Sequence, residues 1–317
     1  MDKNLCVAYA CDNNYVEQTG ISMISLFENN RNFTDIIIYF IDMGVNTDNK
    51  ILLNEIVKSY GRRIIFIKFK DIAWDLNAVE GARHILSVYA KMFLFRVDSE
   101  INKILYLDSD TVITSSLMNL WNENLDGKCI AATKTTCKKC FKRELGIDEK
   151  EAIVNDGIVL IDLALWRQRN YLEKCLKKIK EFDGNPPILS EGVINSVLKQ
   201  DIYYMHPKYN VSAILTMFSR EELIVLTGCS YYAEEQIKEA TSTPAIIHYA
   251  GNTHIRPWFK NSDYPLNEYY YKYKSMSPWK DISLKRRGIS KKMIIVKVIH
   301  KVLPSKLFLY LYKLKNK

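Results

Sequence analysis

Short apolar runs alternate along the first third of the chain with segments whose apolar residues recur every three to four positions. An apolar run bounded by polar residues is typical of a buried strand, and the longer spacing is typical of a helix. Alternation of the two predicts an α/β protein whose central sheet is mostly parallel and is covered by helices on both faces. The strands expected here are residues 5–10, 36–41 and 63–69, and the helices between them are residues 19–27 and 51–60.

The same alternation continues toward the carboxyl terminus with longer polar interruptions, so we expect one α/β domain over residues 1–260. A polar and basic stretch over residues 135–150 is expected to be a loop over a site. Ser190 is expected to be the N-cap of a helix. The further strands expected are residues 103–107, 128–133, 154–162, 203–209 and 245–249, and the further helices are residues 87–97, 117–121 and 166–182.

Composition agrees with an ordered protein that has no membrane-spanning segment. The 317 residues are 48% hydrophobic, with 12 glycines and 8 prolines, and the longest apolar runs are far shorter than the roughly 20 residues that cross a bilayer. The first residues lack the charge pattern of a signal peptide.

Seven cysteines without a framework spacing indicate a reducing cytoplasm. Cys137 and Cys140 are interpreted as two loop thiols, with zinc binding as the alternative because it would need two more ligands.

Positive charge is concentrated at the carboxyl terminus. The chain has a net charge of +9, yet 12 lysines and arginines and a single aspartate lie between residues 280 and 317. Residues 291–303 form an apolar stripe with lysines beside it, and an aromatic-rich apolar segment follows Pro304. Basic amphipathic helices of this kind bind anionic membrane surfaces. We therefore expect residues 261–317 to be a membrane-association segment. The alternatives are a helix packed on the body and a nucleic-acid surface.

Two carboxylates one residue apart, Asp108 and Asp110, follow the strand expected at residues 103–107. Ligands bind at the carboxyl ends of strands in open α/β sheets, and residues two apart on a strand point the same way. Their four oxygens suit Mn²⁺ or Mg²⁺, usually together with substrate phosphates. The chain has no glycine-rich phosphate loop of the G-x-G-x-x-G or Walker type. A bound metal would therefore have to hold the phosphates of a nucleotide.

Two other interpretations of this acidic pair stay open on the residues alone. Asp-Ser-Asp is also a common turn sequence after a strand. Residues 108–112 match the D-x-D-x-T/V pattern of phosphatases of the haloacid dehalogenase type. Those enzymes usually need a later acidic pair that binds Mg²⁺, and the sequence offers no convincing one.

Four separated motifs occur in one order and together resemble the family 8 retaining glycosyltransferases. They are residues 10–15 (ACDNNY), 105–110 (LYLDSD), 155–157 (NDG), and 248–251 (HYAG) followed by Arg-Pro-Trp at 256–258. The resemblance covers roughly residues 4–260. It implies a GT-A fold, a UDP-sugar donor, Mn²⁺ or Mg²⁺ as cofactor, and hexose transfer with retained anomeric configuration.

The resemblance also implies roles for individual residues. Asp108, Asp110 and His248 correspond to the metal ligands, and Mn²⁺ accepts imidazole as well as carboxylate. Tyr15 is expected to stack on the uracil ring of the donor. The residues expected to bind the donor are Ala10, Asp12, Asn14, Tyr15, Lys91, Ser109, Asn155, Gly251 and Arg256.

The sequence departs from the family pattern at three places. Ser190 and Glu191 stand where the family generally has an Asp-Gln pair. We therefore expect the Glu191 carboxylate at the reactive face of the donor sugar, as an electrostatic stabiliser or a nucleophile. Asp156, the other catalytic candidate, is expected either to meet the acceptor or to cap a turn. Arg256 stands where lysine is usual, and the loop before it is two residues longer, which changes how this segment closes over the diphosphate.

These observations predict a metal-dependent retaining hexosyltransferase. It would move glucose or galactose from a UDP-sugar to a lipopolysaccharide core or another cell-surface glycolipid, while attached to the cytoplasmic face of the inner membrane. Nucleic acid is not expected as a partner. The alternatives are a Mg²⁺-dependent phosphatase and a non-catalytic sugar-nucleotide-binding protein.

Overall fold

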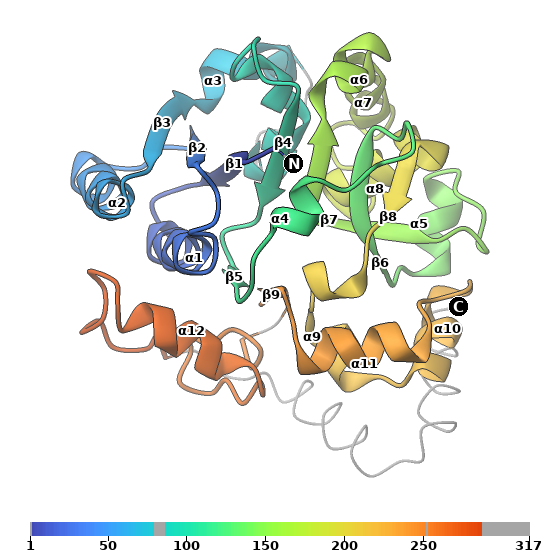
Figure 1. Cartoon of the computed structure of the whole chain (residues 1–317). Coiled ribbons are helices and arrows are strands. Elements are labelled where there is room, and N and C mark those ends of the chain that lie inside the picture. The colour runs from blue at the N-terminus through green and yellow to red at the C-terminus, as the bar shows by residue number, and fades with distance from the viewer. Residues whose placement is uncertain (1, 79–85, 252, 287–317) are drawn as a thin grey trace.

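A seven-stranded sheet forms the centre of the protein in a computed structural model that describes residues 2–78, 86–251 and 253–286 (Figure 1). Strand β1 pairs in parallel with β2 and β4, and β2 pairs in parallel with β3. Strand β7 runs antiparallel between β4 and β6, and β8 is parallel to β6. The predicted mostly parallel sheet is therefore confirmed, with β7 as the reversed strand. In spatial order the strands are β3 (Arg63–Lys68), β2 (Asp35–Asp42), β1 (Asn4–Cys11), β4 (Lys103–Leu107), β7 (Ile153–Asp162), β6 (Ile130–Thr135) and β8 (Ile202–Tyr204).

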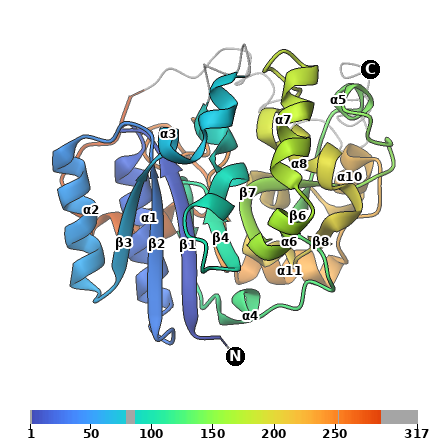
Figure 2. The same ribbon diagram turned by 90° about the horizontal axis from the view of Figure 1, so that it is seen from above.

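Helices lie on both sides of this sheet, as the alternating pattern predicts. Figure 1 shows α1, α11 and α12 below the sheet and α6 and α7 above it, and Figure 2 shows the neighbouring strands β3, β2, β1 and β4 from above. The α-helices are α1 (Val16–Asn29), α2 (Thr47–Ser59), α3 (Phe69–Ile72), α4 (Met118–Trp121), α5 (Lys139–Glu144), α6 (Leu163–Gln168), α7 (Tyr171–Glu181), α8 (Leu189–Leu198), α9 (Ala213–Met217), α10 (Arg220–Thr227), α11 (Glu234–Ser242) and α12 (Asn267–Lys274). The 3₁₀-helices are η1 (Trp74–Ala78), η3 (Leu86–Arg96), η4 (Lys199–Asp201) and η5 (Pro207–Tyr209).

The central strands are buried because both faces of the sheet are covered. Every residue of β1 after Asn4 is buried, and so are the last four residues of β4. A strand covered on both faces reads as a continuous apolar run rather than an alternating one. This explains why these two strands stand out in the sequence, and it places the polar residues that follow them at one edge of the sheet.

A second, two-stranded sheet completes that edge. Strand β5 (Thr111–Ile113) pairs antiparallel with β9 (Ile246–His248), with Thr111 opposite His248. The backbone N–H of Tyr249 also donates to the carbonyl of Asp110 at 2.8 Å. The pairing therefore brings residues from the last third of the chain beside the acidic motif that follows β4.

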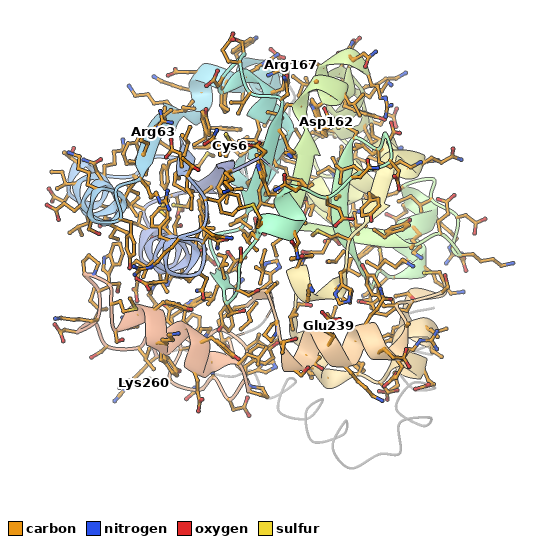
Figure 3. The ribbon with its side chains drawn as sticks, viewed as in Figure 1. Cys6, Arg63, Asp162, Arg167, Glu239 and Lys260 are labelled. Atoms are coloured by element: carbon orange, nitrogen blue, oxygen red, sulfur yellow. The ribbon has the colours of Figure 1, made fainter. Side chains whose placement is uncertain are left out.

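Polar side chains fix the exit from β7. Asp162 ends the strand, and its Oδ1 accepts a hydrogen bond from the backbone N–H of Leu165, so it caps α6. Arg167 of the same helix donates to three backbone carbonyls, those of Phe95, Asp98 and Ile101. Figure 3 labels Asp162 and Arg167 on the upper side of the molecule. These contacts tie the covering helix to the segment that enters β4.

Several predicted element boundaries are wrong. Residues 135–150 contain the short helix α5 rather than only a loop. Residues 166–182 are not one helix, because Asn170 adopts a left-handed conformation between α6 and α7. The strand predicted over residues 203–209 ends at Tyr204, and Pro207, which has no N–H for a strand ladder, begins η5. Residues 87–97 are helical as predicted, in the form of the 3₁₀-helix η3.

The segment after residue 260 packs on the body as far as it is described. Tyr270 and Tyr273 of α12 and Trp279 are buried, and Lys274 forms an ion pair with Glu17 of α1 at 3.0 Å. None of the described helices combines the length and apolarity needed to cross a membrane. The basic amphipathic stretches predicted within residues 287–317 lie outside the described residues.

Candidate active site

Asp108, Asp110 and His248 form a cluster at the carboxyl end of β4. Each offers one ligand atom, and these atoms lie within 4.8 Å of one another. The Nε2 atom of His248 is 3.2 Å from Oδ1 of Asp110 and 3.6 Å from Oδ2 of Asp108. The three residues predicted as metal ligands are therefore brought together, two by the turn after β4 and the third by the β5–β9 pairing.

Gly157 leaves the space that this cluster needs. A Cβ atom at this position would lie 2.4 Å from Cε1 of His248 and 2.6 Å from Oδ2 of Asp108. The carbonyl of Gly157 also accepts the backbone N–H of Asp108 at 2.7 Å. The absence of a side chain at this position thus lets the backbone approach the metal-ligand candidates closely.

Two asparagines connect His248 to Glu191. The Nδ1 atom of His248 lies 3.1 Å from Oδ1 of Asn210, and Nδ2 of Asn210 donates to Oδ1 of Asn155 at 2.8 Å. The Nδ2 of Asn155 then donates to Oε2 of Glu191 at 2.8 Å. Because the Asn210 amide already donates to Asn155, its oxygen must accept from Nδ1–H of His248. In the neutral imidazole the Nε2 atom then keeps its lone pair and faces the two aspartates, as a metal ligand requires.

The charges in the cluster favour a bound cation. Burial raises the pKa of Asp108 despite the nearby charges of Lys91 and His248. For Asp110, burial is outweighed by His248 and Arg256, so the pKa is lowered. Burial also opposes protonation of His248, but Asp110 and Asp108 outweigh it and raise the imidazole pKa. Excess negative charge around a buried imidazole is an environment in which a divalent ion can replace the proton.

A separate buried network holds Asp156. The Nζ of Lys91 lies 2.9 Å from Oδ2 of Asp156 and 2.8 Å from its backbone carbonyl oxygen. The hydroxyl of Ser190 donates to the same Oδ2 at 2.5 Å. Ser190 is the second residue of α8 rather than its N-cap, so that prediction is wrong. Ile188, in a left-handed conformation, is the residue that precedes the helix, so the Ser190 hydroxyl is available to donate to Asp156.

Glu191 is a half-buried carboxylate at the start of α8. Burial, and then the charge of Asp156, raise its pKa to about 8. The hydrogen bond from Asn155 and the charge of Lys91 act in the opposite direction. A carboxyl group with a strongly raised pKa is typical of functional sites.

The residues predicted to bind the donor lie at the end of β1 and after β9, with Lys91 in η3, Ser109 after β4 and Asn155 in β7. Asp12 accepts hydrogen bonds from the backbone and side-chain amides of Asn14. Arg256 connects the two ends, because NH1 donates to the Tyr15 hydroxyl at 3.2 Å and NH2 lies 3.8 Å from Oδ2 of Asp110. The Nε of Arg256 and the hydroxyl of Ser109 are buried without a hydrogen-bond partner among the described residues.

Hydrogen bonds and ion pairs link most of the predicted residues to one another but not all of them. Ala10 is buried at the end of β1, and Gly251 has a left-handed φ of +129° after β9. Neither is joined to the cluster by a side-chain contact among the described residues. Asn210, in contrast, is central to the network and was not predicted. It belongs to no recognisable motif, and its sequence position in the segment after η5 gives no sign of its contact with His248.

Known proteins resemble this chain along most of its length. A family model described as Glycosyl transferase family 8 matches residues 6–262. General stress protein A of Bacillus subtilis is 25% identical over 285 residues, which cover 89% of this chain and 96% of that protein. Lipopolysaccharide 1,2-glucosyltransferase of Escherichia coli is 28% identical over 285 residues, which cover 88% of this chain and 80% of that protein.

Solved structures share the fold. A galactosyltransferase, LgtC, solved with donor and acceptor sugar analogs, matches with a TM-score of 0.70 and 19% identity over 92% of this chain and 99% of its own. The glycosyltransferase GlyE of Streptococcus pneumoniae matches with a TM-score of 0.60 and 20% identity over 90% of this chain and 66% of its own. The predicted GT-A fold is therefore confirmed.

Proposed function

Because this chain belongs to glycosyl transferase family 8, we propose that it moves a hexose from a UDP-sugar to a saccharide acceptor with retention of anomeric configuration. The cluster of Asp108, Asp110 and His248 carries this proposal. Two carboxylates and an imidazole are a donor set that Mn²⁺ accepts, and the imidazole presents its free nitrogen to the aspartates. These residues therefore fit a divalent cation, with Mg²⁺ as the alternative.

The cation would supply Lewis-acid stabilisation to UDP as the leaving group. Arg256 lies beside both Asp110 and Tyr15, and its guanidinium can bind a phosphate with two parallel hydrogen bonds. The uracil and ribose would lie against residues 10–15, with the Tyr15 ring against the base. Lys91 would bind the donor near the sugar, because Asp156 and Asp108 outweigh burial and keep its amine charged.

Glu191 would act on the anomeric carbon of the donor sugar. The Asn155 amide fixes one oxygen of its carboxylate, which leaves the other to face the substrate. A carboxylate there either stabilises the oxocarbenium-like transition state or forms a covalent intermediate. Both roles require the ionised form, which positive charge from a nearby cation favours.

Asp156 would position Lys91 and Ser190 rather than meet the acceptor. Three contacts from these two residues occupy the carboxylate and the backbone carbonyl of Asp156. Ser190 stands where the family generally has an acid. We propose that Asp156, on the neighbouring strand β7, supplies the negative charge that Lys91 needs and that the helix itself does not provide.

The acceptor would be a lipid-linked glycan such as a lipopolysaccharide core. This part of the proposal is supported by the relatives named as lipopolysaccharide 1,2-glucosyltransferase and lipopolysaccharide 1,3-galactosyltransferase. The 12 basic residues between positions 280 and 317 support attachment to an anionic membrane surface. Residues 1–260 would then be the catalytic domain and residues 261–317 the segment that associates with the membrane. The family match favours a transferase over the phosphatase alternative, which is not proposed.

The proposal is tested by hydrolysis of UDP-glucose and UDP-galactose, with and without Mn²⁺. We expect slow, Mn²⁺-dependent release of UDP, and a loss on the order of 100-fold in Asp110→Asn, because one charged ligand is removed. Asp71→Asn, at an exposed carboxylate on α3, is the matched control and should keep full activity. Absence of any metal-dependent release from the wild type would contradict the proposal and favour a non-catalytic binding protein.

A further inference from the structure

A cavity of about 1090 Å³ lies outside the cluster described above, between α5, the start of α8 and α10. Its walls include Phe141 of α5, Ile188 before α8, and three consecutive apolar residues of α10, residues 224–226, all half-buried. Figure 2 shows these three helices at the same end of the sheet. Contiguous apolar surface of this kind, rimmed by polar residues, marks a site for a ligand or partner.

The rim of this groove is positively charged. Lys138, Lys139 and Arg143 of the α5 segment line it, and Glu149 is the acidic residue among its lining side chains. Lys139 and Arg143 share that carboxylate at 2.7 and 3.5 Å. The Nζ of Lys138 lies 5.7 Å from the centre of the Phe141 ring, so a cation stands directly at the apolar wall. The groove therefore matches a ligand that joins an anionic group to an aliphatic one.

A buried lysine makes the groove rigid. Lys142 is 1% exposed, and its Nζ donates to the backbone carbonyls of Glu149, Glu151 and Thr227 at 3.0, 2.7 and 2.9 Å. These bonds join α5, the loop after it and the end of α10 into one unit. A wall that is already ordered loses little conformational freedom when a ligand binds.

Ile188, which lines the groove, precedes Glu191 by three residues at the start of α8. Ile188 and Leu189 both have left-handed φ angles, +51° and +52°, and Ser190 and Glu191 follow directly. Such conformations of non-glycine residues persist only where the surroundings enforce them, often at functional sites. The pKa of the Cys137 thiol in the groove is raised mainly by burial and next by the charge of Glu191. The wall of the groove is therefore connected, through the first turn of α8, to the carboxylate proposed to act on the donor sugar.

We propose that this groove binds the lipid part of the acceptor, an aliphatic chain that carries a phosphate group, so that the saccharide end reaches Glu191. The inference rests on the proposed function and adds the chemical class of the acceptor to it. The basic carboxyl-terminal stretch of this chain is a poor occupant, because its 12 lysines and arginines after residue 279 would face a rim of the same charge.

Calorimetric titration of the full-length protein with dodecyl phosphate, below its micelle concentration, tests the groove. We expect saturable binding that Lys138→Glu weakens about tenfold, because it replaces an attractive charge by a repulsive one at the rim. Lys177→Glu, an equally exposed charge reversal on α7, should leave binding unchanged. Val225→Asp on the apolar wall should also weaken binding, whereas Ile51→Asp at an exposed apolar position of α2 should not.

Four results would overturn the inference. They are equal binding by Lys138→Glu and the wild type, equal binding of dodecyl maltoside, equal binding of inorganic phosphate, and tighter binding of hexaglutamate than of dodecyl phosphate. The last would indicate a site for an acidic peptide. Failure of the groove leaves metal-dependent hydrolysis of the UDP-sugar by the wild type intact, whereas failure of the proposed function removes that hydrolysis itself.

Discussion

At the scale of single residues, the site depends on which atoms the neighbours leave free. Asn210 holds the imidazole of His248 through Nδ1, and Asn155 holds one oxygen of Glu191. Neither asparagine carries a charge. The hydrogen bonds through their two amides nevertheless all donate in one direction, from the histidine toward the carboxylate. Such supporting hydrogen bonds orient a ligand and set its tautomer, and their loss typically weakens metal affinity 10- to 100-fold.

Replacement of Asn210 by leucine tests this orientation. The Nδ1–H of His248 loses its acceptor, so the ring is free to rotate and Nε2 is no longer directed at the aspartates. We expect Mn²⁺ affinity, measured by calorimetry with UDP present, to fall roughly 10- to 100-fold. Asn185→Leu, at an exposed loop position, is the control. Unchanged Mn²⁺ affinity in Asn210→Leu would show that the ring is fixed by packing alone.

Glu191 gives the metal-free protein a pH-dependent stability. Its folded-state pKa is raised, by burial first, from 4.5 to about 8. Between these two pH values the native state binds a proton that the unfolded state releases. The contribution of Glu191 to the free energy of unfolding is therefore fully present below pH 4.5 and is lost as pH rises toward 8.

We therefore expect the melting temperature of the metal-free wild type to fall more between pH 5 and 8 than that of Glu191→Gln. Glutamine keeps an oxygen for the Asn155 amide but cannot ionise, so the difference between the two curves isolates this carboxyl group. A difference of at least about 2 °C is expected, since each 1 kcal/mol shifts the melting temperature of a large domain by roughly that amount. Parallel curves would contradict the raised pKa of the Glu191 carboxyl group. Full transferase activity in the same variant would remove Glu191 from the reaction.

At the scale of elements, single residues decide where helices stop and strands meet. Asn170 separates α6 from α7 with φ of 52° and ψ of 46°, although the apolar spacing of the sequence continues across it. The antiparallel pairing of β5 with β9 brings His248 beside the acidic motif. Both features shape the site, and helix propensity accounts for neither of them. The break turns α7 back toward α8, and the pairing supplies the third ligand.

The left-handed conformation of Asn170 predicts unequal effects of two small substitutions. Asn170→Ala should destabilise the protein by about 1 kcal/mol in urea unfolding, because a Cβ without a polar partner disfavours this conformation. Asn170→Gly should cost less, since glycine adopts it freely. Both variants lose the hydrogen bond from the Asn170 amide to Glu173, so their difference reports the backbone alone. Greater stability of Asn170→Ala than of Asn170→Gly would mean that α6 and α7 form one continuous helix in solution, because a helix interior favours alanine.

At the scale of the whole molecule, residues 261–286, the described part of the segment after residue 260, belong to the folded body. Gly20 of α1 lies against Trp279, since a Cβ there would be 2.3 Å from the indole ring. Lys274 pairs with Glu17 on the same helix. The helix α1 is therefore enclosed between the central sheet and this segment. Any attachment to a membrane through the residues that follow would be transmitted directly to the helix behind β1.

Removal of the Trp279 indole tests how firmly this segment is docked. Trp279 is 6% exposed, so Trp279→Ala should lower the free energy of unfolding by about 3 kcal/mol or more. Trp74 is the matched control, because it is 56% exposed and stacks on Arg96 at 3.9 Å. Trp74→Ala should cost less than about 1 kcal/mol. Similar losses in urea unfolding would show that the segment docks only weakly.

The sequence by itself determined the elements whose signal is local. Buried strands of a covered sheet are continuous apolar runs, so the strands around residues 5–10, 36–41 and 103–107 could be predicted together with the α/β class. The acidic pair after β4 follows from the same reasoning, because strand ends carry ligands in such sheets. The type of each metal-ligand candidate was also readable, since carboxylates and imidazole have recognisable chemistry.

Only the tertiary structure decided which distant residues meet. The contacts of Asn210 with His248, of Asp156 with Lys91 and Ser190, and the groove under α10 join segments far apart in the chain. The local propensity of a residue cannot predict such long-range contacts, because an amide or hydroxyl fits many environments equally well. The break at Asn170 and the wrong N-cap at Ser190 have the same cause, since packing against neighbours overrides local preference. Side-chain type is therefore a property of the sequence, whereas the partner of each side chain is a property of the fold.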